Sequence, residues 1–308
     1  TPWLYNEKGG KIIIGGSMFN LHTKRLKGIE FDTVIFDEAG QVNLPQGIAG
    51  MMAGKKYIFI GDHQQMSPII SAKHDKEYVT RSIFETVFQH NPGTMLDTTY
   101  RMNDKVANFP SQQFYEGRLK SAEEASNRKI KFARTPRQYQ EILNPEKPTV
   151  FVDLAHKNQD MRSPEEATLI TNLIEELLYS GVSSGEIAII APYRAQGRLI
   201  RQTLYRQLNE TDYKYKDVVV DTVERMQGQE REVIIISLTT SDPEHALQKA
   251  QFYFNPNRLN VAITRAKTKL IVVGSKHLFE VKIQDPKLMQ WFDSFKRFYE
   301  HTERVLAH

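Results

Sequence analysis

The chain alternates short apolar runs with polar or glycine-rich turns and helical patterns, and this alternation limits the folds open to it. Within the runs the hydrophobicity is continuous, which is typical of strands covered on both faces in a parallel sheet. Strands alternating with helices predict open α/β sheets that bind ligands beyond the carboxyl ends of their strands. The runs occupy residues 33–36, 57–60, 149–152, 187–190, 233–236 and 270–273.

The clearest helix begins with a capping box, Ser163 to Glu166, and has Pro164 at its first helical position. Apolar residues at helical spacing continue the pattern until it stops near Gly181. The sequence therefore predicts a helix that packs one apolar face on a sheet.

Two other segments interrupt the alternation. The polar stretch 121–147 contains several prolines and predicts a long surface connection instead of core. The stretch 285–308 is rich in aromatic residues and predicts a terminal amphipathic helix that packs on the body.

Composition excludes several classes of protein. With 40% hydrophobic and 25% charged residues among 308, the chain can form real cores. No run approaches the roughly 18 apolar residues of a membrane span, and no signal peptide opens the sequence, so we expect no membrane association. Cysteine is absent, which excludes disulfides and fits a reducing interior; we expect a cytoplasmic protein, with the nucleus also open to it. The net charge of +4 is too small to identify a nucleic-acid binder.

The first candidate site is an acidic pair, Asp37 and Glu38, directly after the apolar run 33–36. A carboxylate at such a strand end holds Mg²⁺ in nucleotide hydrolases, and a neighbouring one orients the attacking water. The alternative is an ordinary solvated strand end, because Asp-Glu pairs are common.

Two further candidates follow along the chain. The segment 59–68 comes directly after an apolar run and contains Gln65, whose amide can sense a γ-phosphate by hydrogen bonding. In the segment 99–102, Arg101 can stabilise charge during phosphoryl transfer and Tyr100 can stack on a base. The alternative for the segment 59–68 is an ordinary polar turn, and the alternative for Arg101 is an ordinary surface arginine.

The last two candidates are the segments 221–230 and 257–267. In the second, we expect Arg258, Arg265 and Lys267 to share a helix with apolar neighbours. A basic helix face is more often solvated than catalytic, so this segment alone does not identify a function. The order in which the five segments occur along the chain decides the interpretation.

In that order, the segments resemble motifs II to VI of superfamily-one helicases, in the branch that contains the helicase of nonsense-mediated mRNA decay. The matching stretches are Asp-Glu-Ala-Gly, Gly-Asp-His-Gln-Gln, Tyr-Arg-Met, Gln-Gly-Gln-Glu and Arg-Leu-Asn-Val-Ala-Ile-Thr-Arg-Ala, and the similarity spans about residues 12–280. Met66 and Gln229 depart from the more usual leucine and basic residue of the family.

The resemblance implies two RecA-like parallel-sheet domains with ATP in the cleft between them. We expect a first domain at 1–95 that is truncated on its N-terminal side, a second at 96–284, and a helical tail at 285–308. It also implies an ATP-dependent helicase or translocase that moves 5′ to 3′ on single-stranded nucleic acid, as a monomer. Backbone contacts do not distinguish DNA from RNA.

The family's functional residues can be transferred motif by motif. Asp37 would bind Mg²⁺ and Glu38 would activate water. Gln65 would contact the γ-phosphate. The remaining nucleotide contacts implied are Tyr100 against adenine, Arg101 and Arg265 as arginine fingers, and Gly228 and Glu230 near the nucleotide. The implied nucleic-acid track includes Ser67, Pro68, Thr222 and the loop 191–194, which contains Pro192 and Tyr193.

One departure is large, because no Gly-x-x-x-x-Gly-Lys-Ser/Thr loop occurs in the sequence. Gly9-Gly10-Lys11 has neither the glycine spacing nor the hydroxyl residue. Since the chain also lacks an initiator Met, we expect it to be a piece of a longer polypeptide, inactive alone and partnered by its own upstream part. The alternative function is a non-catalytic nucleic-acid or protein-docking module that keeps a helicase shape.

Overall fold

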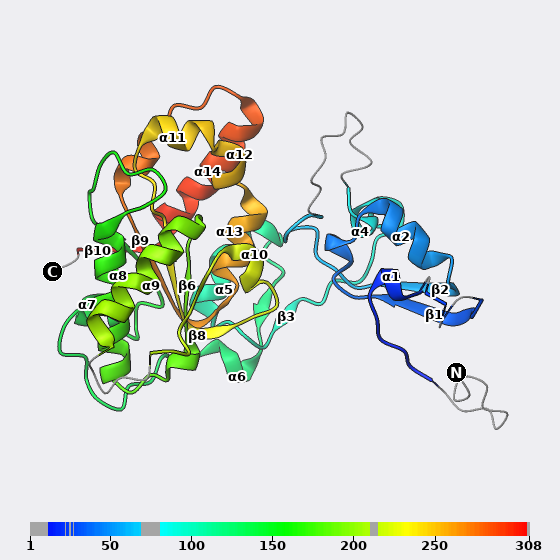
Figure 1. Ribbon diagram of the computed structural model, residues 1–308, viewed down its shortest axis with the longest axis horizontal. Helices are drawn as coiled ribbons and strands as arrows, with labels where there is room; N and C mark the ends of the chain where they lie inside the picture. Colours follow the sequence, from blue (N-terminus) through cyan, green and yellow to red (C-terminus); the bar gives the residue numbers. More distant parts are fainter. Residues whose placement is uncertain are drawn as a thin grey trace. The chain divides into compact units, whose positions relative to one another are not determined.

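The structure is a computed structural model that describes residues 12–21, 23–24, 26, 28–68, 81–209 and 215–306. The chain divides into two compact units, Thr1–Met95 and Leu96–His308 (Figure 1). Gly9-Gly10-Lys11 lies outside the described residues. No helix in the described part is both long and apolar enough to cross a bilayer.

The first unit is a small α/β unit with two parallel strands. Its core lies on one face of this pair, where Phe36 and Phe59 stack with ring centroids 4.7 Å apart and Ile83 packs from the following helix. The elements are α1 (Met18–Leu21), β1 (Phe31–Phe36), α2 (Leu44–Met51), β2 (Gly54–Phe59) and α4 (Ile83–Phe88).

The other face of β1 and β2 corrects one expectation. Strands covered on both faces were predicted, but Ile35 is 60% exposed and Ile58 is 49% exposed. Helices α2 and α4 contribute their apolar residues to the opposite face, beside Val34 and Phe36. A continuous apolar run therefore did not indicate two-sided burial in this unit.

The second unit contains a six-stranded sheet in which every neighbouring pair is parallel. Crossover connections place the strands in the order β10-β5-β9-β8-β6-β7. The strands are β5 (Thr149–Asp153), β6 (Ile187–Ile190), β7 (Val219–Asp221), β8 (Arg231–Ser237), β9 (Ala266–Gly274) and β10 (Glu303–Leu306). Here the prediction of buried parallel strands is confirmed, because β6 is buried at every position and β9 at all but one.

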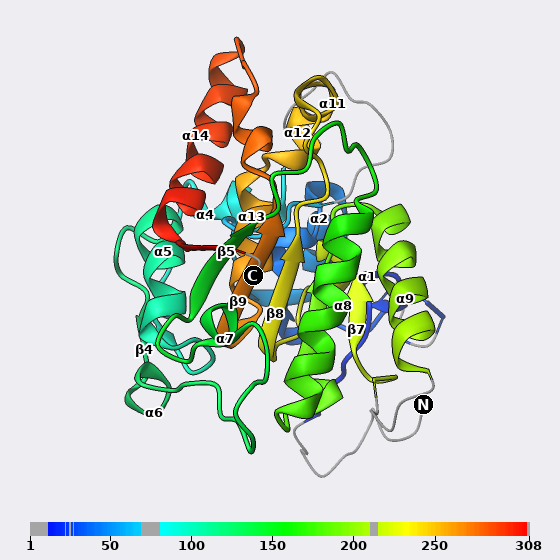
Figure 2. The same ribbon diagram turned by 90° about the vertical axis from the view of Figure 1, so that its left-hand side faces the viewer.

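Helices cover both faces of this sheet (Figure 2). On one face, α8 (Pro164–Tyr179) and α9 (Arg194–Leu208) bury Ile170, Leu173 and Ile200 against alternate residues of the strands. On the other face lie α5 (Asp104–Phe114), α13 (Pro256–Ile263) and α14 (Pro286–His301). The helix predicted from Pro164 is confirmed, including Ser163 as its N-cap.

The predicted surface connection at 121–147 was wrong. It contains two short helices, α6 (Glu123–Ser126) and α7 (Gln140–Leu143). Ile142 and Leu143 are almost completely buried in the core beneath α8, with Ile130 beside them. Isolated apolar residues in a proline-containing polar stretch carry no periodic signal, so their burial was not visible in the sequence.

The end of the described chain also differs from the prediction. The expected amphipathic helix forms as α14, and its Phe292, Phe295 and Phe298 face inward. After it, however, β10 adds a strand parallel to β5, with Glu303 opposite Val150. This segment is therefore part of the sheet as well as of the helical layer.

Lys269 is a buried lysine within β9, and its ammonium donates to the backbone oxygens of Asn144 and Lys147. Burial lowers its pKa from 10.5 to about 7, while the carboxylates of Glu303 and Glu141 act in the opposite direction. Between these pH values the unfolded chain holds a proton that the folded chain has released, so this group makes stability rise with pH.

Replacing Lys269 with methionine should therefore remove part of the pH dependence of stability. From about pH 7 to pH 10, the original protein should gain up to about 1.4 kcal/mol per pH unit relative to the variant. Urea unfolding of both proteins across this range measures the difference. Parallel stability curves would show that Lys269 keeps its proton in the folded state.

Candidate functional site

In the first unit, the loops that follow β1 and β2 lie side by side. The amide of Ala39 donates to the carbonyl of Ile60 at 2.8 Å, and the amide of Ile60 donates to Phe36 at the same distance. A side chain at Gly61 would place its Cβ 2.8 Å from the nitrogen of Gly40. Glycine at both positions therefore allows the two loops to approach closely, a role that no sequence pattern indicated.

Asp37 and Glu38 lie at this carboxyl edge, and both are exposed. Glu38 has a left-handed backbone with φ of 50°, which is unusual for a residue with a side chain. Its amide donates to Asp37 Oδ1 at 3.0 Å, and its Oε2 accepts from Gln41 at 3.2 Å. Such strained backbones are concentrated at functional sites, where the surrounding structure holds them.

Gln65 belongs to the adjacent loop, and Asp62 orients it. The Nε2 of Gln65 donates to Asp62 Oδ2 at 2.8 Å, while Oδ1 accepts from the amide of Gln64 at 2.8 Å. The structure thus brings the predicted Gln65 to the same edge as the acidic pair. Asp62 was missed as an orienting residue, although it stood within a recognised motif. Ser67 is exposed and Pro68 partly buried.

The acidic pair is chemically suited to Mg²⁺. This ion is commonly held by one or two carboxylates, with its other ligands supplied by water and phosphate oxygens. Asp37 and Glu38 are exposed carboxylates of that kind. Among the described residues, no group of three or more metal-binding side chains forms a closed site. The donor set therefore fits an ion that arrives with a nucleotide.

In the second unit, Arg101 joins three of the recognised motifs. Its Nε contacts Glu230 Oε2 at 2.6 Å, and its NH1 donates to the backbone oxygen of Thr264 at 2.9 Å. Lys267 lies 3.5 Å from the same glutamate. The hydrogen bond from Arg101 and the charge of Lys267 lower the pKa of Glu230. Tyr100, beside this cluster, is 66% exposed.

Arg265 is placed differently. Its side chain is almost fully buried, and its Nε donates to the carbonyl of Val261 at 3.0 Å while NH1 donates to Gln229 at 3.3 Å. The helix α13 ends at Ile263, so the expected sharing of one helix by Arg258, Arg265 and Lys267 was wrong for the last two. Arg265 instead occupies the turn before β9, since the helix's last carbonyls need donors that it supplies.

Gly228, the remaining residue that was predicted to lie near the nucleotide, has φ of 75° and open space where a side chain would begin. It lies two residues before Glu230, in the turn that leads into β8. Gly228 and Glu230 are therefore both in the loop whose Gln229 carbonyl accepts from Arg265.

The predicted track residues of this unit meet at the ends of two neighbouring strands. The amide of Ala191 donates to the carbonyl of Asp221 at 3.0 Å, so Pro192, Tyr193 and Thr222 follow the paired carboxyl ends of β6 and β7. Tyr193 stacks on Phe252, with ring centroids 5.7 Å apart, and burial raises the pKa of its hydroxyl.

Phe252 was not predicted to be part of this edge, and neither was the ion pair below it. The guanidinium of Arg258 lies 3.9 Å from the Phe252 ring centroid and pairs with Glu224. Burial lowers the pKa of Arg258, while Glu224 acts in the opposite direction. No sequence pattern indicates this arrangement, because the partners come from separate helices.

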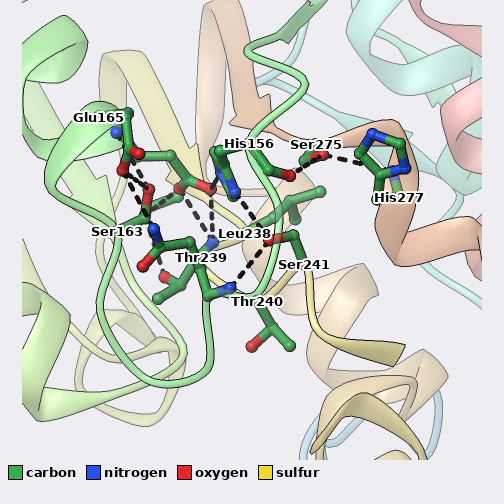
Figure 3. A network of polar contacts seen from close by, with 12 residues as sticks. His156, Ser163, Glu165, Leu238, Thr239, Thr240, Ser241, Ser275 and His277 are labelled. Atoms are coloured by element: carbon green, nitrogen blue, oxygen red, sulfur yellow. Dashed lines mark hydrogen bonds and ion pairs between the residues drawn. The ribbon is translucent and has the colours of Figure 1, made fainter. Parts of the chain in front are cut away.

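A buried polar network supports the same edge of the sheet (Figure 3). At its centre is Glu166, which is fully buried. Its carboxylate accepts from the amide of Thr239 at 2.8 Å and from the hydroxyl of Ser237 at 2.5 Å, and it contacts His156 Nε2 at 2.8 Å. The other ring nitrogen of His156 lies 2.9 Å from Ser241 Oγ.

The network explains why only half of the predicted capping box forms. Ser163 Oγ accepts from the amide of Glu166, as expected. The amide of Ser163, however, donates to the side chain of Gln196 instead of to Glu166. The side chain of Gln196 donates in turn to Ser163 and Ser237. The loop ends of β5 and β8 and the starts of α8 and α9 are thus held together.

The chain matches two family models, both described as an AAA domain, over residues 79–277 and 13–73. It is 30% identical to an uncharacterized ATP-dependent helicase of Methanocaldococcus jannaschii, over 91% of this chain and 41% of the relative. It is 33% identical to the DNA polymerase alpha-associated DNA helicase A of Schizosaccharomyces pombe, over 88% and 41%. A regulator of nonsense transcripts 1 homolog of Drosophila melanogaster is 30% identical, over 82% and 21%.

Among solved structures, the PRRSV helicase matches with a TM-score of 0.40 and 16% identity, over 79% of this chain and 34% of that one. The chain spans 41% of the length of the first two curated relatives. The chain belongs to the AAA domain family, in the superfamily-one branch that includes the helicase of nonsense-mediated decay.

Proposed function

We propose that the complete protein is an ATP-dependent helicase or translocase that acts on single-stranded nucleic acid inside the cell. The observation that carries this proposal is the convergence at Arg101. It contacts Glu230, 129 residues away along the chain, and the carbonyl of Thr264, 163 residues away. These positions belong to three separate helicase-like motifs, and a solvated surface arginine would have no reason to join them.

The side chains divide the chemistry of phosphoryl transfer between them. Asp37 would hold Mg²⁺, which supplies charge neutralisation on the phosphates when it is bound with ATP. Glu38 would orient the attacking water and take up its proton. Gln65, oriented by Asp62, would donate to the γ-phosphate.

The second unit would supply positive charge and the base contact. Arg101 would exchange Glu230 for a phosphate oxygen, because both acceptors are anionic and a guanidinium can bind either one. Arg265 would have to leave two backbone carbonyls to do the same. Tyr100 is exposed and would pack on adenine. Gly228 has open space where a side chain would begin and would leave room beside the nucleotide.

Single-stranded nucleic acid would contact Pro192, Tyr193 and Thr222 in this unit. In the first unit it would contact Ser67 and Pro68. Contacts there would be made mainly to phosphates and sugars, so binding should fall with salt and tolerate sequence. We further propose RecA-like domains at 1–95 and 96–284, followed by a tail in which β10 completes the sheet of the second domain, and movement from 5′ to 3′.

The proposal is tested by ATP hydrolysis in the complete protein, with and without single-stranded DNA or RNA. We expect single strands to stimulate ATP hydrolysis. We also expect ATP-dependent unwinding of a duplex with a single-stranded tail to depend on which end carries the tail. Strand binding that is indifferent to ATP, with no hydrolysis, would instead support the docking-module alternative.

A further inference from the structure

The exposed side of α9 is basic and contains no acidic residue. Arg194, Arg198, Arg201 and Arg206 are all exposed, and Tyr205 among them is 61% exposed. We call these five residues the α9 arginine face. The opposite side of the helix packs into the core, with Ile200, Leu204 and Leu208 buried.

Helical spacing aligns most of this face. Arg194, Arg198, Arg201 and Tyr205 are separated by four, three and four residues, so their side chains form one stripe along the helix. At about 1.5 Å per residue the stripe is roughly 16 Å long, enough for a few phosphates of a nucleic-acid strand. Arg206 lies beside its far end and lines a shallow surface hollow with Arg201 and Tyr205.

The position of the face connects it to the proposed track. Helix α9 begins immediately after Pro192 and Tyr193, at the carboxyl end of β6. It then runs along β7, the edge strand of the sheet, where Arg201 donates to the carbonyl of Val220 (Figure 2). A nucleic-acid strand that leaves the track on this side would contact these arginines next.

The ordinary alternative is a solvated helix face, and the charge pattern argues against it. Solvated helices usually mix charges, because opposite charges at spacings of three or four stabilise the helix and like charges destabilise it. Here the arginines face one another at those spacings, and Arg194 stands in the first turn, where the helix dipole disfavours a cation. Within the described residues, no carboxylate forms an ion pair with any of the four. The arginines of this face therefore destabilise the helix by repulsion, and a bound anionic ligand would offset that repulsion.

We propose that the α9 arginine face binds the phosphodiester backbone of the nucleic acid beyond the track, extending the footprint by a few nucleotides. The inference rests on the proposed function, since it takes the track at Pro192 and Tyr193 as its starting point. Guanidinium groups bind phosphate oxygens through paired hydrogen bonds, and the exposed ring of Tyr205 offers a stacking surface for a base.

The test compares binding of fluorescent single-stranded oligonucleotides to the complete protein and to the double variant Arg198→Gln, Arg201→Gln. A short oligonucleotide that fills only the track should bind both proteins alike. A long one should bind the variant on the order of tenfold more weakly at low salt, and the slope of log affinity against log salt should fall by about 1.4, or about 0.7 for each lost contact. Turnover of ATP at saturating strand concentration should not change.

The matched control is the double variant Lys282→Gln, Lys296→Gln, which removes the same charge from exposed positions elsewhere in this unit. Because Arg201 also contacts the backbone, a second pair, Arg198→Gln with Arg206→Gln, repeats the test without it. Equal salt slopes in these variants and the control would overturn the proposal. So would a loss confined to binding of polyglutamate or of anionic lipid vesicles, which would assign the face to an acidic protein or a membrane surface.

The two proposals fail in different ways. If single strands stimulate ATP hydrolysis but the arginine variants bind like the control, only the role of the face is wrong. If the unaltered protein binds no single strand, both proposals fall.

Discussion

Replacing Glu38 with glutamine is expected to lower strand-stimulated ATP turnover by about 10²–10⁴-fold, the usual contribution of a positioned general base. The amide keeps the size and hydrogen-bonding reach of the side chain but cannot take up a proton. Nucleotide affinity should change little, because the proposed Mg²⁺ ligand, Asp37, is retained. Steady-state hydrolysis and equilibrium binding of ATP by the complete protein separate the two effects.

The control for this variant is Glu30→Gln, which changes another exposed glutamate of the first unit, one that pairs with Lys55. Its turnover should stay within about twofold of the original, because exposed ion pairs contribute little. Unchanged turnover in the Glu38 variant would show that this carboxylate is not the base. Equal loss in both variants would indicate a general effect of charge near the strand ends.

Replacing Glu166 with alanine should destabilise the second unit by about 3–5 kcal/mol, as expected when one partner of a buried ion pair or hydrogen-bonded charge network is removed. Thr239, Ser237 and His156, which are all buried, would lose their shared acceptor. The free energy of unfolding, measured in urea with a probe of this unit, reports the loss directly.

Glu165→Ala is the matched control, since it lies in the same first turn of α8 but is exposed. It should cost under about 1 kcal/mol. Glu166→Gln should fall between the two, because an amide keeps one acceptor but adds a donor that needs a partner. A Glu166→Ala variant as stable as the Glu165 control would mean that the network contributes nothing net.

The sequence predicted where some candidate residues lie better than it predicted their contacts. Continuous apolar runs placed Asp37, Glu38 and Gln65 after strand ends, and β1 and β2 do end just before them, because strand ends follow directly from the pattern of the chain. The inward turn of Arg265 depends on carbonyls at Val261 and Gln229, and their positions come only from tertiary packing.

The same limit applies to Glu166. From the sequence it was half of a local capping box, and the N-cap hydrogen bond does form. Its carboxylate nonetheless contacts residues more than 70 positions further along the chain. Local patterns identify the residues that begin a helix, whereas long-range competition decides which hydrogen bonds their side chains make.

The pairing of β10 with β5 has a consequence for how this fold is assembled. Val305 lies opposite Val152, so the sheet acquires its outermost strand from a segment synthesised about 150 residues later. Until that segment emerges from the ribosome, the backbone amides and carbonyls along one side of β5 have no strand partner. Unpaired edges of this kind invite association between chains, so a nascent chain would be most prone to aggregate during that interval.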